Sequence, residues 1–106
     1  CIRDRRANVL GEYGGIGWVV KNHIWEPDRN WGYIQFNSSK EVTDEYIKYT
    51  DMLYDLIIRG FSAAVYTQTT DVEVEVNGLM TYDRKVIKVD EKRVREANAR
   101  ICKSLK

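Results

Sequence analysis

Glu12 is the residue in this sequence best suited to covalent chemistry. It follows a short β-capable run over residues 7–10 and is flanked by Gly11, Gly14 and Gly15. Glycines let the backbone turn sharply and let a ligand approach it closely. A carboxylate at the end of a barrel strand can act as a nucleophile or a general base, whereas the alternative is a solvated glutamate in a glycine-rich turn. The local sequence leaves both interpretations open.

A second group of polar residues begins where an apolar stretch ends. Thr67 and Gln68 stand at the end of that stretch, and Asp71 is the carboxylate closest to them. Polar side chains at the carboxyl ends of strands build the active sites of many α/β enzymes. We therefore expect Thr67 and Gln68 to bind substrate hydroxyls and Asp71 to line the same pocket.

The segment from Ile16 to Asn37 carries a histidine and three tryptophans, His23, Trp18, Trp25 and Trp31, without a sustained period. Flat aromatic faces can stack on sugar rings, and the alternative is that these rings pack the long loop onto the body of the protein. A single histidine makes neither a metal site nor a catalytic triad, so His23 is expected to be a hydrogen-bonded loop residue or at most a substrate contact.

Two amphipathic helices are predicted to hold these segments in place. Ser38 and Glu41 have the spacing of a capping box, and Gly60 is expected to end the helix that begins there. Asp90 is expected to cap the second helix. The apolar stripes are Val42, Tyr46, Tyr49, Leu53 and Leu56 in the first helix and Val94, Ala97, Ile101 and Leu105 in the second.

The strands are predicted from two different patterns. Residues 61–66 form a continuous small and apolar run, which is typical of strands buried on both faces in a parallel sheet. In residues 72–76 valines alternate with Glu73 and Glu75, which predicts a strand-like ribbon that leads into a hairpin turn at Asn77-Gly78. The two glutamates are then expected to pair with basic side chains of the hairpin. The acidic residues do not have the spacing of an EF-hand calcium site. The predicted order is strand, long loop, helix, strand, long loop, helix.

The composition excludes several classes of partner. The 106 residues include 17 basic and 16 acidic ones, a net charge of +1 that gives no electrostatic reason to expect nucleic acid or a membrane surface. No apolar run approaches the roughly 20 residues of a membrane-spanning helix. The sequence begins with Cys1 and not Met, so we expect a segment of a longer protein. Cys1 and Cys102 match no zinc or redox spacing and are expected to be unrelated thiols, with a disulfide as the alternative.

Two stretches of the sequence resemble glycoside hydrolase family 2, the family of β-galactosidases, β-mannosidases and β-glucuronidases. Residues 9–15, Val-Leu-Gly-Glu-Tyr-Gly-Gly, resemble the end of the family's seventh barrel strand. Residues 63–68 and 77–85 resemble its eighth strand and the hairpin that follows. The resemblance covers nearly the whole chain. It implies an α/β fold in which residues 1–106 form one segment, a βαβα fragment equivalent to the last two β/α units of a TIM barrel.

The resemblance implies that Glu12 is the catalytic nucleophile of a retaining β-glycosidase that hydrolyses terminal β-linked sugars. Thr67, Gln68 and Asp71 would line the sugar pocket, with Trp18 or Trp25 at its rim. The family's acid/base glutamate belongs to the fourth barrel strand, which this sequence does not contain, so the chain alone is expected to be inactive. No cofactor and no metal are implied.

The implied partners are a carbohydrate substrate and the rest of the barrel, or further copies of the chain. Better-studied members commonly have a tryptophan in the eighth strand where Tyr66-Thr67-Gln68 stands here, so the sugar stays open. The compartment also stays open, and a periplasmic or secreted bacterial parent protein is compatible with the resemblance. Two alternatives remain: a non-catalytic carbohydrate-binding remnant, and a free-standing βαβα interaction domain.

Overall fold

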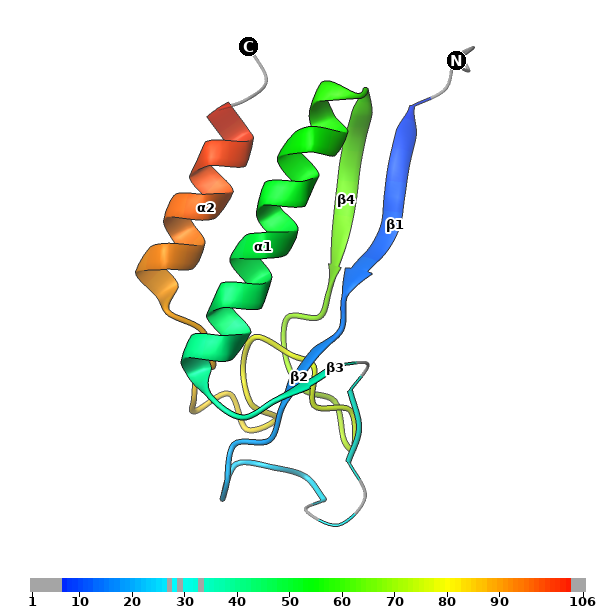
Figure 1. Cartoon of the computed structure of the whole chain (residues 1–106). Coiled ribbons are helices and arrows are strands. Elements are labelled where there is room, and N and C mark those ends of the chain that lie inside the picture. The colour runs from blue at the N-terminus through cyan, green and yellow to red at the C-terminus, as the bar shows by residue number, and fades with distance from the viewer. Residues whose placement is uncertain (1–6, 27, 29, 33, 104–106) are drawn as a thin grey trace.

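The structure, a computed structural model, describes residues 7–26, 28, 30–32 and 34–103, and it combines parallel strands with two helices (Figure 1). The predicted order of elements is confirmed, and the first long loop contains two additional short strands. The expectations for Cys1 and Leu105 fall outside the described residues. The elements are β1 (Asn8–Gly14), β2 (Ile16–Trp18), β3 (Ile34–Phe36), α1 (Ser39–Ile58), β4 (Phe61–Thr67) and α2 (Glu91–Lys103).

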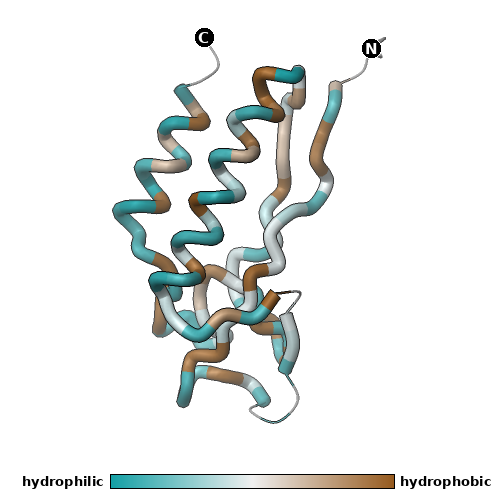
Figure 2. Tube along the Cα trace, in the orientation of Figure 1, coloured by the Kyte–Doolittle hydropathy of each residue, from teal (hydrophilic) through white to brown (hydrophobic). Residues whose placement is uncertain are grey.

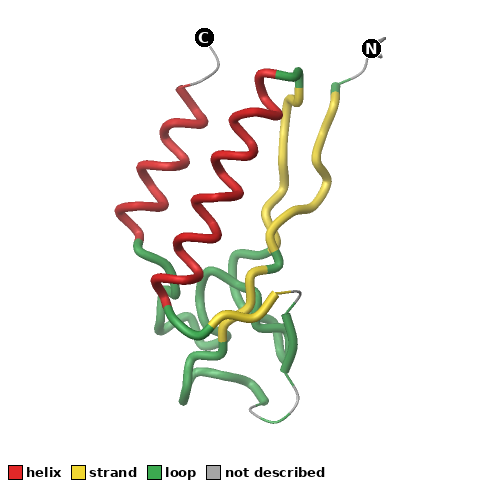
Figure 3. The backbone as a smooth tube through the Cα atoms, in the orientation of Figure 1, coloured by secondary structure: helices red, strands yellow, loops and turns green. Residues whose placement is uncertain are grey.

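The strands β1 and β4 form a parallel pair, with α1 as the connection between them. The helix α1 packs against β4 on one side and α2 on the other, so the elements form successive layers (Figure 1). The carboxyl ends of β1 and β4 point toward the loops, which gather at one end of the molecule (Figure 3). The start of β1 and the end of α2 both lie at the opposite end, with α1 and β4 between them (Figure 1).

The expectation that residues 61–66 are buried on both faces is wrong. β4 forms there as predicted, but Val65 in its middle is 54% exposed, and Val9 on β1 is 53% exposed. The reason is that, among the described residues, this sheet consists of β1 and β4 and carries helices on one face. Both strands contain hydrophobic stretches (brown in Figure 2), so apolar surface faces outward here.

The helix α1 begins and ends as its sequence predicts. The Ser38 side chain accepts a hydrogen bond from the Glu41 backbone N–H at 3.2 Å, which satisfies one of the free donors at the helix start. At the other end Gly60 adopts a positive φ of 107°, a conformation that other residues avoid. Val42 and Tyr46 from the predicted stripe are buried, together with Thr43 and Thr50 beside them.

The helix α2 is capped by Asp90, whose Oδ1 accepts hydrogen bonds from the backbone N–H groups of Lys92 at 3.1 Å and Arg93 at 3.3 Å. It buries Val94 and Ala97, as predicted. The Asp90 backbone N–H also donates to Thr43 Oγ1 at 2.9 Å, which joins the start of α2 to α1.

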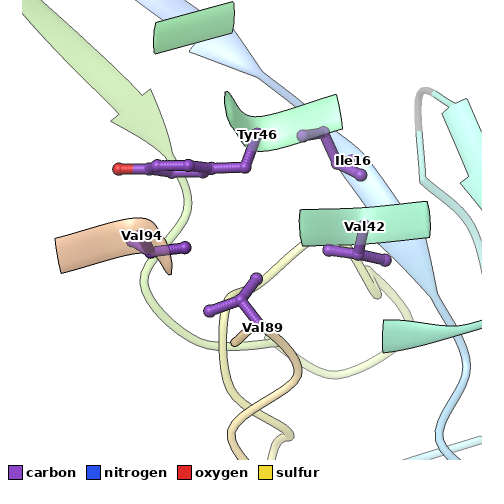
Figure 4. Close-up of a cluster of buried hydrophobic side chains, with 5 residues drawn as sticks. All are labelled: Ile16, Val42, Tyr46, Val89 and Val94. Carbon is purple, nitrogen blue, oxygen red and sulfur yellow. The ribbon is translucent and has the colours of Figure 1, made fainter. Parts of the chain in front are cut away.

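The hydrophobic core lies at the loop end of the molecule. Five buried side chains from β2, α1, the loop before α2 and α2 itself pack together (Figure 4). Trp18, Phe36 and Leu79 are among the partly buried side chains that surround them. The long loops therefore help to build the core and do not merely connect its elements. The five central residues are Ile16, Val42, Tyr46, Val89 and Val94.

The predicted hairpin at Asn77-Gly78 is wrong. Val72 and Glu75 instead exchange both backbone hydrogen bonds, at 3.1 and 2.9 Å, so the tight turn falls at Glu73 and the residue after it. Glu73 supplies the positive φ, 51°, that such a turn requires. Asn77 and Gly78 are buried because their backbone lies against residues 70–71, where it has no space for a Cβ on Gly78.

The dimensions of the chain are those of an extended body. Its radius of gyration is 15.2 Å and its principal extents are 48 × 26 × 18 Å. A compact domain of this length has a radius of gyration of about 13 Å. The long axis runs along the helices and strands and continues into the loops (Figure 1).

Candidate active site at the carboxyl ends of the strands

Glu12 lies in a β-bulge near the end of β1. Leu10 pairs with Ala64 and Tyr13 pairs with Tyr66, so two residues of β1 stand opposite a single residue of β4. Bulges redirect the side chains of the extra residues and are frequent next to active sites. The Glu12 side chain is exposed as a result.

Thr67 is the residue that the structure brings to Glu12. Its Oγ1 donates a hydrogen bond to Glu12 Oε1 at 3.1 Å. The preceding residue, Tyr66, directs its ring toward Tyr46 of α1, with ring centroids 5.0 Å apart. Since side chains alternate along a strand, Thr67 and its partner Glu12 lie on the face of the sheet turned away from the helices.

Glycine is required where the two strands end. Gly14 has a φ of 108°, and a Cβ there would lie 2.7 Å from the Tyr66 ring and 2.8 Å from the Thr67 carbonyl oxygen. Gly15 follows and donates its N–H to that same carbonyl at 2.9 Å. The glycines that flank Glu12 therefore allow the close approach that the sequence predicted, but the group that approaches them is β4. A depression at this point is lined by Glu12, Tyr13, Gly14, Gly15 and Thr67.

Tyrosine rings back the sheet behind this depression. Tyr13 meets Tyr66 edge-on, with ring centroids 5.2 Å apart. Burial, aided by the nearby Tyr46, raises the pKa of Tyr13 to about 12, and burial also raises the pKa of Tyr66. Both phenols are neutral at physiological pH and provide an apolar layer between Glu12 and the helices.

Asp71 lies in a different environment. It is 4% exposed, and its Oδ1 accepts hydrogen bonds from the Gly78 backbone N–H at 2.9 Å and from Lys88 Nζ at 2.7 Å. Lys88, which is fully buried, also donates to the carbonyl oxygens of Trp18 at 2.7 Å and Val76 at 3.0 Å. Burial raises the pKa of Asp71 and lowers that of Lys88, and the ion pair opposes both shifts. The ion pair lies within the second long loop, and the hydrogen bond from Lys88 to the Trp18 carbonyl joins that loop to the end of β2.

Gln68 is also engaged within the protein. Its Nε2 donates to Asn77 Oδ1 at 2.6 Å, and Asn77 is completely buried. Trp18 packs against the core cluster, and its backbone N–H donates to the Val76 carbonyl at 3.0 Å. Gln68 and Trp18 do not line the depression at Glu12.

A second cluster, which we call the aromatic–imidazole cluster, lies beyond the strand ends and consists of His23, Trp25, Tyr82 and Asp83. Trp25 and Tyr82 meet edge to face, with ring centroids 4.8 Å apart and planes inclined at 74°. His23 Nδ1 lies 2.7 Å from Asp83 Oδ2. The expectation that His23 is a hydrogen-bonded loop residue is thus confirmed.

Asp83 is held as a carboxylate in this cluster. Its Oδ1 accepts hydrogen bonds from Thr81 Oγ1 at 2.6 Å and from the Lys85 backbone N–H at 3.0 Å. These donors, together with His23, hold the pKa of Asp83 well below its usual range. An ionised carboxylate only accepts hydrogen bonds, so His23 must donate from Nδ1. Its Nε2 has no partner among the described residues.

Of the six predicted site residues, the structure brings only Thr67 into contact with Glu12. Sequence reasoning missed Lys88 and the pairing of His23 with Asp83. The signal for Lys88 was available, since a lysine inside the apolar run 86–89 requires a buried partner. No group of three or more potential metal-ligating side chains is found among the residues that the structure describes.

No protein-family model matches the chain, and no curated protein matches it significantly. Neither described helix is both long and apolar enough to cross a membrane.

Proposed function

We propose that this chain is part of a retaining β-glycosidase in which Glu12 is the nucleophile. The observation that carries the proposal is the position of Glu12 in a bulge at the carboxyl ends of two parallel strands. Its Oε1 is fixed there by Thr67 at 3.1 Å, on the face away from the helices. Catalytic groups of barrel enzymes lie at this end of their strands.

The proposed step forms a bond between a Glu12 carboxylate oxygen and the anomeric carbon of the sugar while the bond to the leaving oxygen breaks. A second carboxyl group, about 5 Å from the first, must protonate that oxygen and then activate water. Among the described residues that line the depression, Glu12 supplies the one carboxylate. The acid/base residue must therefore come from elsewhere in a larger protein, and the chain alone is predicted to be inactive.

The exposed sheet supports a larger protein. β1 and β4 are parallel, and α1 packs against β4 on one face, as in two consecutive β/α units of a barrel. Val9 and Val65 leave more than half of their surface in solvent. Apolar strand edges of this kind require covering, by the remaining strands of a barrel in this proposal.

The test is Glu12→Gln in the intact protein, assayed with p-nitrophenyl β-glycosides. The kcat is expected to fall on the order of a thousandfold or more, because the amide cannot form the covalent intermediate. A 2-deoxy-2-fluoro glycosyl fluoride should label wild-type protein at Glu12 in peptide mass spectra and leave the variant unlabelled. The control is Glu96→Gln, an exposed glutamate on α2, which should retain full activity. Undiminished hydrolysis by Glu12→Gln would falsify the proposal.

A non-catalytic carbohydrate-binding protein is the second candidate. The observation in its favour is the exposed edge-to-face pair of Trp25 and Tyr82, which is independent of Glu12. Saccharide binding without any hydrolysis by the intact wild-type protein would favour this candidate over the first.

A further inference from the structure

The aromatic–imidazole cluster has the features of a small-ligand site and is separate from the depression at Glu12. Trp25 is 51% exposed and Tyr82 is 43% exposed, although their rings touch. An edge-to-face contact uses the edge of one ring and one face of the other, and it leaves the remaining ring faces available. Large aromatic rings that are exposed next to each other are typical of binding surfaces.

His23 adds a directional polar group to these rings. Asp83 Oδ2 accepts a hydrogen bond from His23 Nδ1 at 2.7 Å and thereby fixes the orientation of the imidazole ring. The Nε2 atom of His23 is then available for a hydrogen bond with a ligand hydroxyl, which can act as donor or acceptor. The Asp83 carboxylate is itself held by Thr81 and by the Lys85 backbone. The imidazole is therefore already oriented before a ligand binds, and binding requires no rearrangement there.

The chemistry of the cluster favours an uncharged, hydroxyl-bearing ring over a cation. The Asp83 carboxylate is already engaged by donors at both oxygens, which leaves it weakly available as a counter-ion. Apolar ring faces beside a single fixed hydrogen-bonding group match a sugar, which has apolar C–H faces and hydroxyls at its edge.

We propose that the aromatic–imidazole cluster is an accessory saccharide subsite that binds a sugar ring of an oligosaccharide beyond the ring held at Glu12. That a sugar ring is held at Glu12 rests on the function proposed above. The two loops that supply the cluster follow β1 and β4, the strands that position Glu12 and Thr67. The hydrogen bonds from Lys88 to the Trp18 carbonyl and from the Trp18 N–H to the Val76 carbonyl fix these loops to each other. A ligand at the cluster is thus held in a constant relation to the strand ends.

The experiment compares Trp25→Ala and Tyr82→Ala with wild type in the intact protein. Hydrolysis is measured with a p-nitrophenyl β-glycoside, which has one sugar, and with β-1,4-linked gluco-, galacto- and manno-oligosaccharides of two to four units. We expect each variant to raise the KM for the preferred oligosaccharide about tenfold, the loss of one stacking contact, without a change in its kcat. The KM for the aryl glycoside should stay unchanged, and Trp25→Phe should restore most of the oligosaccharide affinity.

Two controls separate this proposal from the first. Tyr54→Ala removes a tyrosine of α1 that is 41% exposed and should leave every parameter unchanged. Calorimetric binding of the same oligosaccharides is measured in Glu12→Gln, which retains the cluster. If the wild type hydrolyses nothing but Trp25→Ala loses oligosaccharide binding, the subsite stands and the glycosidase proposal fails. If none of the oligosaccharides binds, or if the cluster variants match wild type in both assays, the subsite proposal is overturned.

Discussion

The two ends of this molecule are built on opposite principles. The end that contains β1 and β4 has regular secondary structure, yet it leaves Val9 and Val65 more than half exposed. The end that contains the long loops has few regular elements, yet it holds the hydrophobic core and the fully buried Lys88. Regularity of the backbone and completeness of packing are therefore separate properties. Among the described residues, the loops bury their side chains against one another, whereas one face of the sheet stays open to solvent.

The sharpest test of this contrast is Lys88→Met. Removal of the Lys88 ammonium group leaves the buried Asp71 charge uncompensated, which typically lowers the free energy of unfolding by about 3–5 kcal/mol. Urea denaturation of the variant should show this loss in the free energy of unfolding. Addition of Asp71→Asn should recover part of it, because the amide oxygen can still accept from Gly78. Lys85→Met, at an exposed lysine nearby, is the control, and equal stability of the two lysine variants would break the comparison.

A pair of glycine substitutions comes next in expected size. A Cβ at Gly78 would collide with the backbone of Thr70 and Asp71, whereas a Cβ at Gly11 on β1 meets nothing within 4 Å. Gly78→Ala is therefore expected to destabilise the protein by about 1–3 kcal/mol. Gly11→Ala should be neutral, or stabilising by up to about 1 kcal/mol through the unfolded state. Thermal denaturation of both variants measures the difference in their stability. The two variants should be equally stable if the backbone at residues 70–71 can move to accommodate the added methyl group.

A pair of valine substitutions measures the same contrast in side chains. Val76 in the loop is fully buried and Val65 on β4 is 54% exposed. Val76→Thr places an unpaired hydroxyl in the core and should cost about 1–2 kcal/mol. Val65→Thr should change the free energy of unfolding by less than about 0.5 kcal/mol and should reduce self-association of the chain in sedimentation velocity runs. A large loss at Val65 would show that the sheet face is covered.

The smallest effects are expected from pH, since Asp83 and Tyr13 are both partly exposed. The pKa of Asp83 is depressed in the folded protein. Asp83 therefore stabilises the fold at pH values above the unfolded pKa of about 4, and this stabilisation is lost as the pH falls below that value. The pKa of Tyr13 rises from 10.0 to about 12, so its contribution is lost as the pH rises through that interval.

Acid should therefore weaken the loop end first and base the sheet end first. Tryptophan fluorescence below pH 4 and tyrosinate absorbance above pH 10 report the two transitions. Asp83→Asn should abolish the acid effect and Tyr13→Phe the alkaline one. Sensitivity of both variants to the same extreme of pH would contradict the assignment.

Local signals predicted the helices well and the loops poorly. The Ser38 cap and Gly60 fixed the limits of α1 because capping depends on a few neighbouring residues. The order of strands and helices was predicted correctly because apolar residues recur at the helical or strand period that the backbone geometry imposes. The turn at Glu73 was missed because Asn77-Gly78 is the better local turn sequence, and contacts with residues 70–71 override it.

The candidate site shows the same limit. Glu12 stood out because of its glycine neighbours, and Thr67 because it ends a strand. Asp71 looked equally suitable, but its role depends on Lys88, seventeen positions further along the chain. A sequence pattern shows which side chains are polar, but it does not show which of them are already paired. His23 and Asp83, sixty positions apart, illustrate this further, since nothing local to either residue predicts the other.

The start of β1 and the end of α2 lie at the same end of the molecule, which has a consequence for protein engineering and for evolution. The described part of the chain begins and ends at one end of the molecule, while the loops lie at the other end (Figure 1), next to the strand ends where Glu12 and Thr67 stand. A segment of this kind can be exchanged between related scaffolds without rerouting the chain on either side. Grafting of residues 7–103 as a cassette would transfer the whole loop face in a single step and leave the connections of the recipient intact.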